Sequence, residues 1–212
     1  LRKIAVEPAY FLSLLKSGSD ILKPVAYEKS LAAAEQLLKE TKIDKEVLVS
    51  YYLLSKNDEI TPLALQKLLY YTQGFSYIFI GEFMFASDCE SWVHGPVYRD
   101  IYNQFQEFGR EPIVLDRTYD ISSCFTSQEI LLLDSIVQHL SVYNGKVLEK
   151  FTHEESPWLS ARRDLKEDEP SNKIIDKNSI AEFFTRVKEK YDMLTVDDLS
   201  AYTKARFDNL SF

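Results

Sequence analysis

The sequence is poor in the residues that disulfide frameworks, phosphate loops and metal sites require. Its six glycines are not clustered as in phosphate-binding loops, and its two cysteines make no disulfide framework. The cysteines and the three histidines also lack the paired short spacings of structural zinc sites. These five residues are Cys89, Cys124, His94, His139 and His153. We therefore expect no cofactor and no metal.

Long apolar runs are also missing. No run approaches the ~20 residues of a membrane-spanning helix, and the N-terminus carries no secretory signal. We therefore expect no membrane partner and a cytoplasmic location. The net charge of −8 disfavours nucleic acid as a partner of this segment and suits a basic protein partner. A modest negative charge is equally typical of ordinary soluble domains.

Apolar and aromatic residues are plentiful, at 45% hydrophobic residues with thirteen tyrosines and thirteen phenylalanines. This composition is typical of a globular chain. We predict a mainly α fold (α+β with a minor β element), a compact helical domain with a small β-hairpin or sheet. The expected divisions are an N-terminal helical extension or connector (1–58), a main domain (59–190) and a C-terminal helix (191–212). Because the chain opens with Leu1, we expect it to be a fragment or the ordered part of something longer.

A long apolar helix begins the most informative stretch, residues 61–109. Thr61 is a good N-cap and Pro62 suits the first helical position. An apolar stripe follows at three- and four-residue steps. Its members are Leu65, Leu68, Leu69, Thr72, Phe75 and Phe79. We expect Gly74 to mark close packing against another backbone and Gly81 to end the helix.

The segment after this helix alternates with a period of two on both sides of residues 86–88, which predicts a hairpin with its turn there. Gly95 and Pro96 then form a corner that is expected to start a second helix. Its apolar stripe comprises Val97, Ile101, Phe105 and Phe108.

The remaining elements are predicted from caps and turns. Within 1–57 we expect three short helices, starting at Pro8, Pro24 and Asp44. Thr126 or Ser127, Ser179 and Thr195 are expected N-caps, and Thr152 with Glu155 matches a capping box. A strand at 113–115 is expected to pair with one at 173–176, and the charged segment 164–172 is expected to be a solvated loop.

Two sets of residues are candidate site positions. The partner-binding set joins an amide and tyrosine face of the long helix to the corner, and it requires exposed tyrosines. It comprises Gln66, Tyr70, Gln73, His94, Tyr98 and Tyr102. The other set comprises Trp92, Gly95, Pro96, Pro157 and Trp158, for which we favour a structural role over a recognition surface.

Catalytic alternatives have less support. Cys89 and His94 lie five residues apart, but no motif holds this thiol and imidazole in register, so a buried thiol is the simpler interpretation. The Arg162–Arg163 pair is interpreted as solvated or ion-paired rather than as an anion site. We therefore expect no enzyme, although an enzyme of an unrecognised type stays open.

Three segments carry a family resemblance: LQKLLYYTQGFSYIFIGEFMF, ESWVHGPVYRDIYNQF and FTHEESPWLSAR. In this order they resemble the Panacea domain, a phage-associated domain of antitoxins in bacterial toxin–antitoxin systems, over roughly residues 59–187. The resemblance implies that the protein neutralises a cognate toxin, encoded nearby, through direct protein contact without catalysis.

The resemblance leaves alternatives open. One branch of the family is a proteolytic adaptor that delivers its toxin to a Clp-type protease. Some members carry an N-terminal DNA-binding domain, so the chain could be the C-terminal part of a DNA-binding autoregulator. A homo-oligomer is also compatible with the sequence, which identifies neither the toxin nor the interface.

Overall fold

The computed structural model describes residues 44–115 and 121–210, and these residues form a mainly α fold, as predicted. The two short helices predicted to start at Pro8 and Pro24, and most of the 1–58 segment, lie outside the described residues. Eight α-helices and a two-stranded sheet are described. The helices are α3 (Lys45–Lys56), α4 (Pro62–Ile80), α5 (Arg99–Phe105), α6 (Ser127–His139), α7 (Gly145–His153), α8 (Ser156–Arg162), α9 (Lys177–Lys190) and α10 (Leu199–Asp208).

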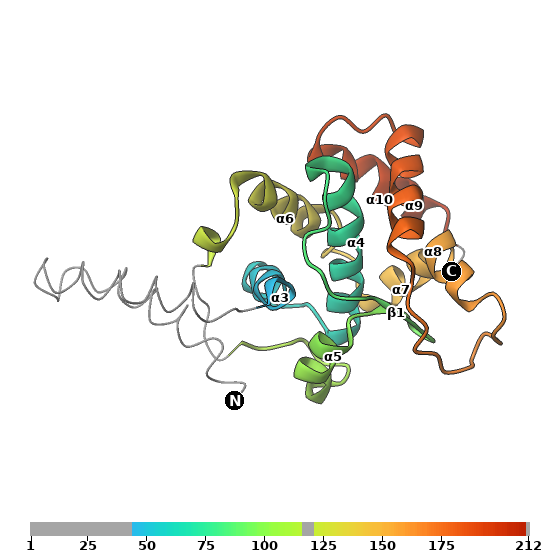
Figure 1. Ribbon diagram of the computed structural model, residues 1–212. Coiled ribbons are helices and arrows are strands. Elements are labelled where there is room, and N and C mark those ends of the chain that lie inside the picture. The colour runs from blue at the N-terminus through green and yellow to red at the C-terminus, as the bar shows by residue number, and fades with distance from the viewer. Residues whose placement is uncertain (1–43, 116–120, 211–212) are drawn as a thin grey trace, which may run out of the picture.

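Helix α4 stands at the centre of the molecule, with α3 and α6 on one side and α7 and α9 on the other (Figure 1). Every residue from Ala64 to Ser76 is buried, because α3, α6, α7 and α9 pack around α4. Thr61 caps it by accepting a bond from the Ala64 amide, and Gly81 ends it in the left-handed region with φ 97°. Both ends are as predicted.

Helix α9 packs closely against α4 because residue 74 has no side chain. A Cβ atom at Gly74 would lie 2.1 Å from the Phe184 ring of α9, so even alanine would force the two helices apart. The prediction of close packing at Gly74 is confirmed, although the neighbour is a ring and not a backbone.

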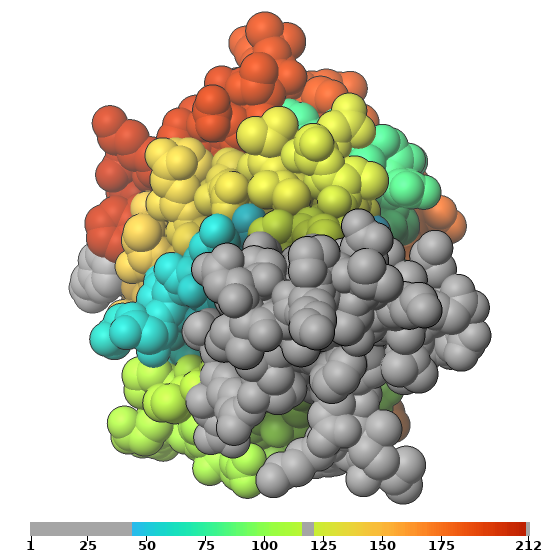
Figure 2. Space-filling view, turned by 90° about the vertical axis from the view of Figure 1, so that its left-hand side faces the viewer, coloured from blue at the N-terminus to red at the C-terminus, as the bar shows by residue number. Residues whose placement is uncertain are grey.

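Helix α3 lies between α6 and the green segment that begins with α5, as the space-filling view shows from the side (Figure 2). Tyr52 of α3 donates a hydrogen bond to Asp134 of α6 at 2.7 Å, and Lys45 forms an ion pair with Glu129. Val49, Tyr52, Leu53 and Leu54 form the buried face of α3, whereas Val47 and Tyr51 are half-buried.

The hairpin exists, but its turn is not where the alternation placed it. Strands β1 (Glu90–Trp92) and β2 (Gly95–Val97) pair antiparallel, so Val93 and His94 form the turn. Residues 86–88 belong to the connection before β1. The helix expected from Pro96 begins at Arg99, because Pro96 is taken into β2.

Some of the capping predictions are confirmed and others are wrong. Thr126 caps α6, which was one of the two expected positions, and Glu129 completes a capping box with it. The box at Thr152 is wrong, because Thr152 lies in the last turn of α7 and donates to the Glu149 carbonyl at 2.9 Å. Asp176, not Ser179, caps α9. Thr195 caps the short 3-10 helix η3 (Val196–Asp198) before α10.

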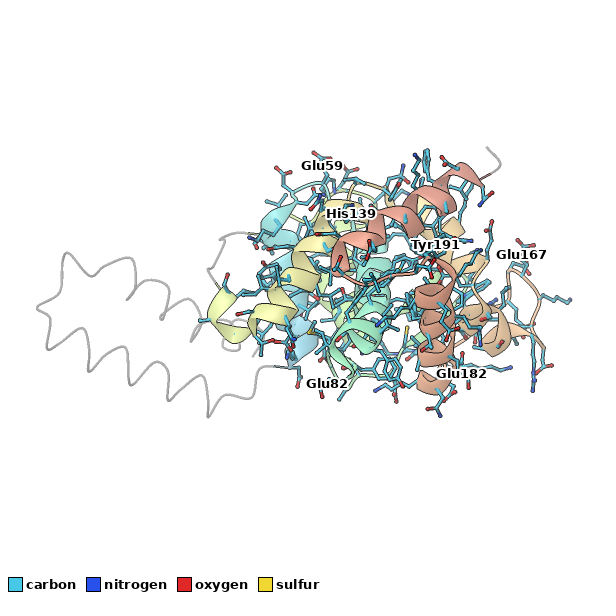
Figure 3. The ribbon with its side chains drawn as sticks, turned by 90° about the horizontal axis from the view of Figure 1, so that it is seen from above. Glu59, Glu82, His139, Glu167, Glu182 and Tyr191 are labelled. Atoms are coloured by element: carbon cyan, nitrogen blue, oxygen red, sulfur yellow. The ribbon has the colours of Figure 1, made fainter. Side chains whose placement is uncertain are left out.

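The predicted pairing of 113–115 with 173–176 is wrong as well. The Ile113 amide donates to the Ile60 carbonyl at 2.8 Å, whereas Ile174 forms a bridge with Glu90 of β1. The 164–172 loop is exposed for most of its length, as expected for a charged segment. Its outermost part carries Glu167, which Figure 3 shows at the edge of the molecule.

Helix α10 is joined to the rest by a buried carboxyl group. Glu155, 1% exposed, accepts hydrogen bonds on one oxygen from Tyr71 of α4 at 2.8 Å and from Tyr202 of α10 at 2.5 Å. Its other oxygen and the Tyr70 hydroxyl are buried without a hydrogen-bond partner. Burial raises the pKa of Glu155, against the lowering effect of the bonds from Tyr202 and Tyr71. The boundaries predicted at 59 and 190 stay predictions, but α10 shares one apolar core with α3 and α4.

Candidate functional site

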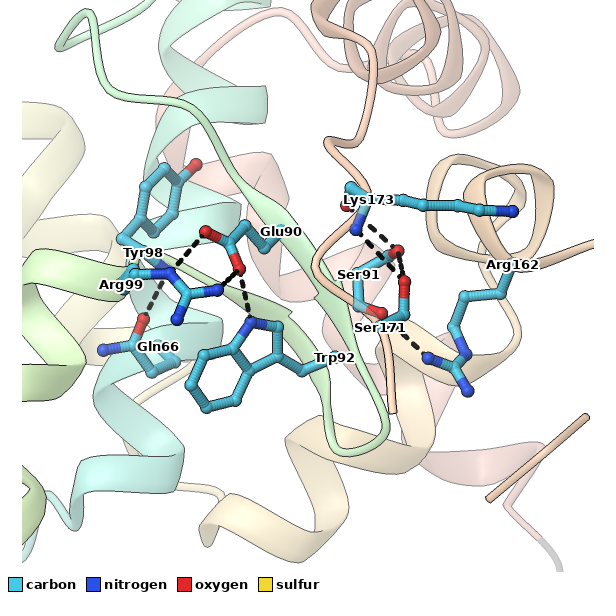
Figure 4. A network of polar contacts seen from close by, with 9 residues as sticks. All are labelled: Gln66, Glu90, Ser91, Trp92, Tyr98, Arg99, Arg162, Ser171 and Lys173. Carbon is cyan, nitrogen blue, oxygen red and sulfur yellow. Dashed lines mark hydrogen bonds and ion pairs between the residues drawn. The ribbon is translucent and has the colours of Figure 1, made fainter. Parts of the chain in front are cut away.

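The β1–β2 hairpin is held from both sides, which makes its turn a rigid projection. On one side β1 pairs with β2. On the other side the Ser91 amide donates to the Lys173 carbonyl at 2.8 Å, and the Ile175 amide donates to the Cys89 carbonyl at 2.7 Å. The Ser91 hydroxyl also lies 3.3 Å from that of Ser171 (Figure 4). The segment 171–175 is thereby fixed beside β1.

Gly95 is required at the start of β2 for two reasons. Its φ is 94°, in the region that L side chains rarely adopt. A Cβ there would also lie 2.8 Å from both the Lys67 Cε atom and the Thr152 hydroxyl oxygen. The corner therefore has no room for a side chain at position 95, and the structural role of Gly95 stays a prediction.

Lys67 fills the space behind Gly95 and is fully buried. Its Nζ donates to the Pro96 carbonyl at 3.0 Å. Burial lowers the pKa of Lys67 to about 7, although the nearby Cys89 and Glu149 raise it. Lys67 was not among the predicted site residues, because a lysine on an otherwise apolar helix is usually exposed. Its position in the middle of the apolar run was the available signal.

The side-chain amides that were predicted to contact a partner instead form hydrogen bonds within the protein. The Gln66 Oε1 atom accepts from the Tyr98 amide at 2.7 Å, and Gln73 exchanges two bonds with the backbone of Phe85. The partner-binding prediction required exposed side chains. This requirement fails for four residues, which are all at most 2% exposed: Gln66, Tyr70, Gln73 and Tyr98. The physical reason is that the non-helical segment 82–98 needs hydrogen-bond partners for its buried backbone groups, and α4 supplies them.

Two residues of that set are at the surface. His94, whose side chain is 66% exposed, makes a 2.8 Å contact from Nδ1 to Glu149 of α7. Lys146 pairs with the same carboxylate at 2.7 Å. Burial alone would raise the pKa of Glu149, but the bonds from Lys146 and His94 lower it below its usual value. Tyr102 is half-buried against the Trp92 ring at 4.8 Å.

Trp92 is ordered by a charged pair. Its indole N–H donates to Glu90 at 2.7 Å, and Arg99 grips the same carboxylate with two bonds of 2.8 and 2.5 Å (Figure 4). The Arg99 guanidinium also lies 5.3 Å from the Trp92 ring centre. Desolvation opposes ionisation of Glu90, but the bonds from Arg99 and Trp92 bring its pKa below the usual value. Trp92 is thus held in place while half-buried.

Trp158 and Arg162 fasten α8 to the hairpin. The Trp158 indole donates to the Trp92 carbonyl at 2.9 Å, and its ring stacks on His153 at 4.1 Å. Arg162 donates to the Ser91 carbonyl and, through Nη2, to three carbonyls between residues 166 and 169. Pro157 is buried in the first turn of α8.

The interpretation of Arg162 as solvated or ion-paired is wrong, because its side chain is buried among backbone carbonyls. Arg163, in contrast, is exposed beside Asp164 at 3.5 Å, as expected. The signal for Arg162 was its position four residues after Trp158, which places both on one helix face. Their cation–ring distance is 5.1 Å.

An open groove of about 570 Å³ lies between the hairpin and the end of the 164–172 loop. This volume is within the range of about 300–1,000 Å³ that is usual for binding pockets. The groove is lined by Trp92, Val93, His94, Arg99, Pro170, Ser171 and Asn172. We call it the hairpin groove. Exposed acidic residues of the loop, Glu167, Asp168 and Glu169, adjoin it in the sequence.

Cys89 does not make a nucleophile with His94. The thiol is 2% exposed, and burial raises its pKa to about 12, against the lowering effect of Lys67. A thiol with this pKa carries almost no thiolate near neutral pH. Cys89 is therefore a small buried side chain, and no group of three or more potential metal ligands occurs within 44–115 and 121–210.

The hairpin, its supporting helices and the first half of α8 coincide with a family match. Residues 65–159 match the family model described as "Antitoxin SocA-like, Panacea domain". Residues 65–159 are therefore similar to the Panacea domain. The match covers somewhat less than half of the 212 residues and a shorter range than the 59–187 of the resemblance. The matched segment contains the Trp92–Pro96 corner and Trp158, whereas residues 170–172 of the groove lie after it.

Neither the curated proteins nor the solved structures contain a match to this chain. The match to the family model supports an antitoxin role in general terms, with a toxin as the partner. In the part of the chain that the structure describes, no helix is long and apolar enough to cross a membrane.

Proposed function

We propose that this protein is an antitoxin that neutralises its cognate toxin by direct contact, without catalysis, and that the hairpin groove is the contact surface. The observation that carries the proposal is the Panacea domain match over residues 65–159, which includes the hairpin side of the groove. The exposed residues of the corner, His94 above all, keep the partner-binding role proposed for them. Tyr102 keeps the proposed partner-binding role because it lies beside Trp92.

Rigidity supports the choice of this surface. Gln66, Lys67 and Arg162 each fix a different strand or loop of the corner through backbone carbonyls or amides. A surface held in this way loses little conformational entropy on binding. Trp92 is half-buried and ordered by Arg99, and ordered aromatic side chains are typical anchors of protein interfaces.

Charge supports a basic partner. The chain carries a net charge of −8, and the loop beside the groove exposes Glu167, Asp168 and Glu169. Opposite charges accelerate encounter, so salt should lower the association rate more than it raises the dissociation rate. No binding to duplex DNA by this chain is expected.

The test is co-expression of the protein with the gene next to its own, followed by affinity purification and mass spectrometry of the copurified protein. Val93→Arg places a cation in the groove and should weaken the complex at least tenfold. Leu194→Arg is the matched control, because Leu194 is 87% exposed and does not line the groove. Equal affinities of the two variants would place the interface elsewhere, and the absence of any copurified protein would contradict the antitoxin function.

The proteolytic adaptor is the second candidate, because it shares the toxin contact and differs only in requiring a protease. Toxin rescue in a host without Clp-type and Lon-type proteases separates the two. An antitoxin that blocks its toxin only has to stay bound to it, so we expect the cells to be rescued from the toxin in that host as well. A stable complex without rescue in that host would favour the adaptor.

A further inference from the structure

A second cavity lies outside the Panacea domain, between α9 and α10. Its volume is about 160 Å³. Tyr191, the C-cap residue that follows α9, lies at the corner where the chain turns towards α10 (Figure 3). Phe183 and Val187 of α9 and Tyr202 of α10 contribute apolar surface to it. The volume is below the ~300 Å³ of the smallest usual ligand pockets, so the cavity holds a group of about the size of one side chain.

Three cations surround this apolar cavity in a protein whose net charge is negative. Arg186 and Lys190 lie one turn apart on α9, and Arg206 comes from α10. The side chain of Arg186 is 59% exposed, and its nearest carboxylate, that of Glu182, lies 3.8 Å away with a side chain that is itself 71% exposed. Arg186 also donates a long hydrogen bond of 3.4 Å from Nη2 to the Ser156 hydroxyl. Both interactions are exposed and weak, so the Arg186 charge stays largely available to a ligand.

Arg206 is held more firmly and keeps an unused donor. Its Nη2 atom donates to the Phe151 carbonyl at 2.7 Å and pairs with Glu154 at 3.0 Å. Its Nε atom is buried without a hydrogen-bond partner. The buried carboxyl group of Glu155 lies behind this wall, bonded to Tyr202. Burial raises the pKa of Glu155 above its usual value.

We propose that this α9–α10 pocket binds the C-terminal aliphatic residue of a partner peptide, with its side chain in the cavity and its carboxylate between Arg186 and Lys190. A guanidinium binds a carboxylate through two parallel bonds, which favours an arginine at such a site. The apolar cavity and the cationic edge together select a ligand that has both groups. This proposal is independent of the toxin contact at the hairpin groove.

The probes are N-acetyl-leucine, N-acetyl-leucinamide and N-acetyl-glycine, titrated into the ¹⁵N-labelled full chain and followed by amide chemical shifts. N-acetyl-leucine should shift amides of α9 and α10 saturably. The leucinamide lacks the carboxylate and the glycine derivative lacks the side chain, so each should bind at least fivefold more weakly.

Arg186→Gln with Lys190→Gln should weaken N-acetyl-leucine binding at least tenfold, whereas Lys166→Gln with Lys204→Gln removes the same charge elsewhere and should leave it unchanged. All four side chains are on exposed residues, and unchanged melting midpoints would show that the fold is intact. Equal binding of acid and amide, equal weakening by both double variants, or no shifts on α9 and α10 would each overturn the proposal.

Discussion

Lys67 and Glu155 are both buried ionisable residues, and each joins α4 to a segment far away in the sequence. Lys67 lies beneath the hairpin and donates to the backbone of Pro96. Glu155 lies between α4 and α10 and accepts bonds from the side chains of Tyr71 and Tyr202. The hairpin is therefore positioned through backbone geometry, whereas α10 is positioned through side-chain hydroxyls.

The two residues also make stability depend on pH with opposite signs. Burial favours the uncharged form of each, which lowers the pKa of Lys67 to about 7 and raises that of Glu155. As pH falls from about 10.5 to 7, the unfolded chain binds a proton at Lys67 that the folded chain resists, so stability falls. As pH rises above about 4.5, the unfolded chain loses a proton at Glu155 that the folded chain keeps, so stability falls again.

The largest effect is expected from filling the space next to Lys67. Gly95→Val imposes a strained backbone and a clash with Lys67 and Thr152, and it should cost about 4 kcal/mol of the free energy of unfolding. Gly81→Val is the matched control, since φ is 97° there but a Cβ meets nothing within 4 Å. It should cost about 2 kcal/mol through strain alone. Denaturant unfolding measures both, and equal costs would show that Lys67 does not restrict the corner.

The α4 region also shows what the sequence was able to predict. Its caps, its apolar stripe, the positive φ of Gly95 and the close packing at Gly74 follow from local chemistry, and all agree with the structure. The burial of Gln66, Gln73 and Lys67 does not follow, because it depends on backbone groups of segments that reach α4 only after folding. The hairpin groove was missed for the same reason, since residues 170–172 meet β1 only in three dimensions.

Charge removal at the hairpin is the second test. Lys67→Met replaces a long side chain by an apolar one of similar length. It removes the cost of burying the lysine charge, which is about 1.4 kcal/mol for each unit by which the pKa of Lys67 is lowered. It also leaves the Pro96 carbonyl without its hydrogen bond, at a cost of about 1–3 kcal/mol. We expect a net gain of about 2 kcal/mol at pH 7.

The pH profile distinguishes this cause from general repacking. Wild-type stability should rise between pH 7 and about 9, and the Lys67→Met variant should lose most of that rise. Above pH 9 the unfolded chain loses a proton at Cys89 that the folded chain keeps, which opposes the rise in both proteins. Cys89, Glu149 and Lys146 are the other charged or titratable groups that act on Lys67, and all three are retained in the variant. A variant with the wild-type slope would show that Lys67 ionises equally well in the folded and unfolded chains.

The smallest effect is expected at α10. Glu155→Gln keeps an oxygen that accepts from Tyr71 and Tyr202, and its amide N–H can donate to the unpaired Tyr70 hydroxyl. It should therefore stabilise the protein at pH 7 by about 1 kcal/mol, the net value of one hydrogen bond, and remove the loss of stability that Glu155 causes above pH 4.5.

Hydrogen exchange of the α10 amides in parallel with global unfolding localises this effect. The charged or polar groups around Glu155 are Tyr70, Tyr71, Tyr202 and Arg206, and the substitution leaves all four in place. In the wild type we expect α10 to open more easily as pH rises from 5 to 8. In Glu155→Gln the protection of the α10 amides against exchange should not change with pH, after correction for the intrinsic exchange rate. If Glu155→Gln instead loosens α10 at every pH, the carboxylate is bound in its charged form, with Arg206 as the counter-ion, and the two buried residues do not oppose each other.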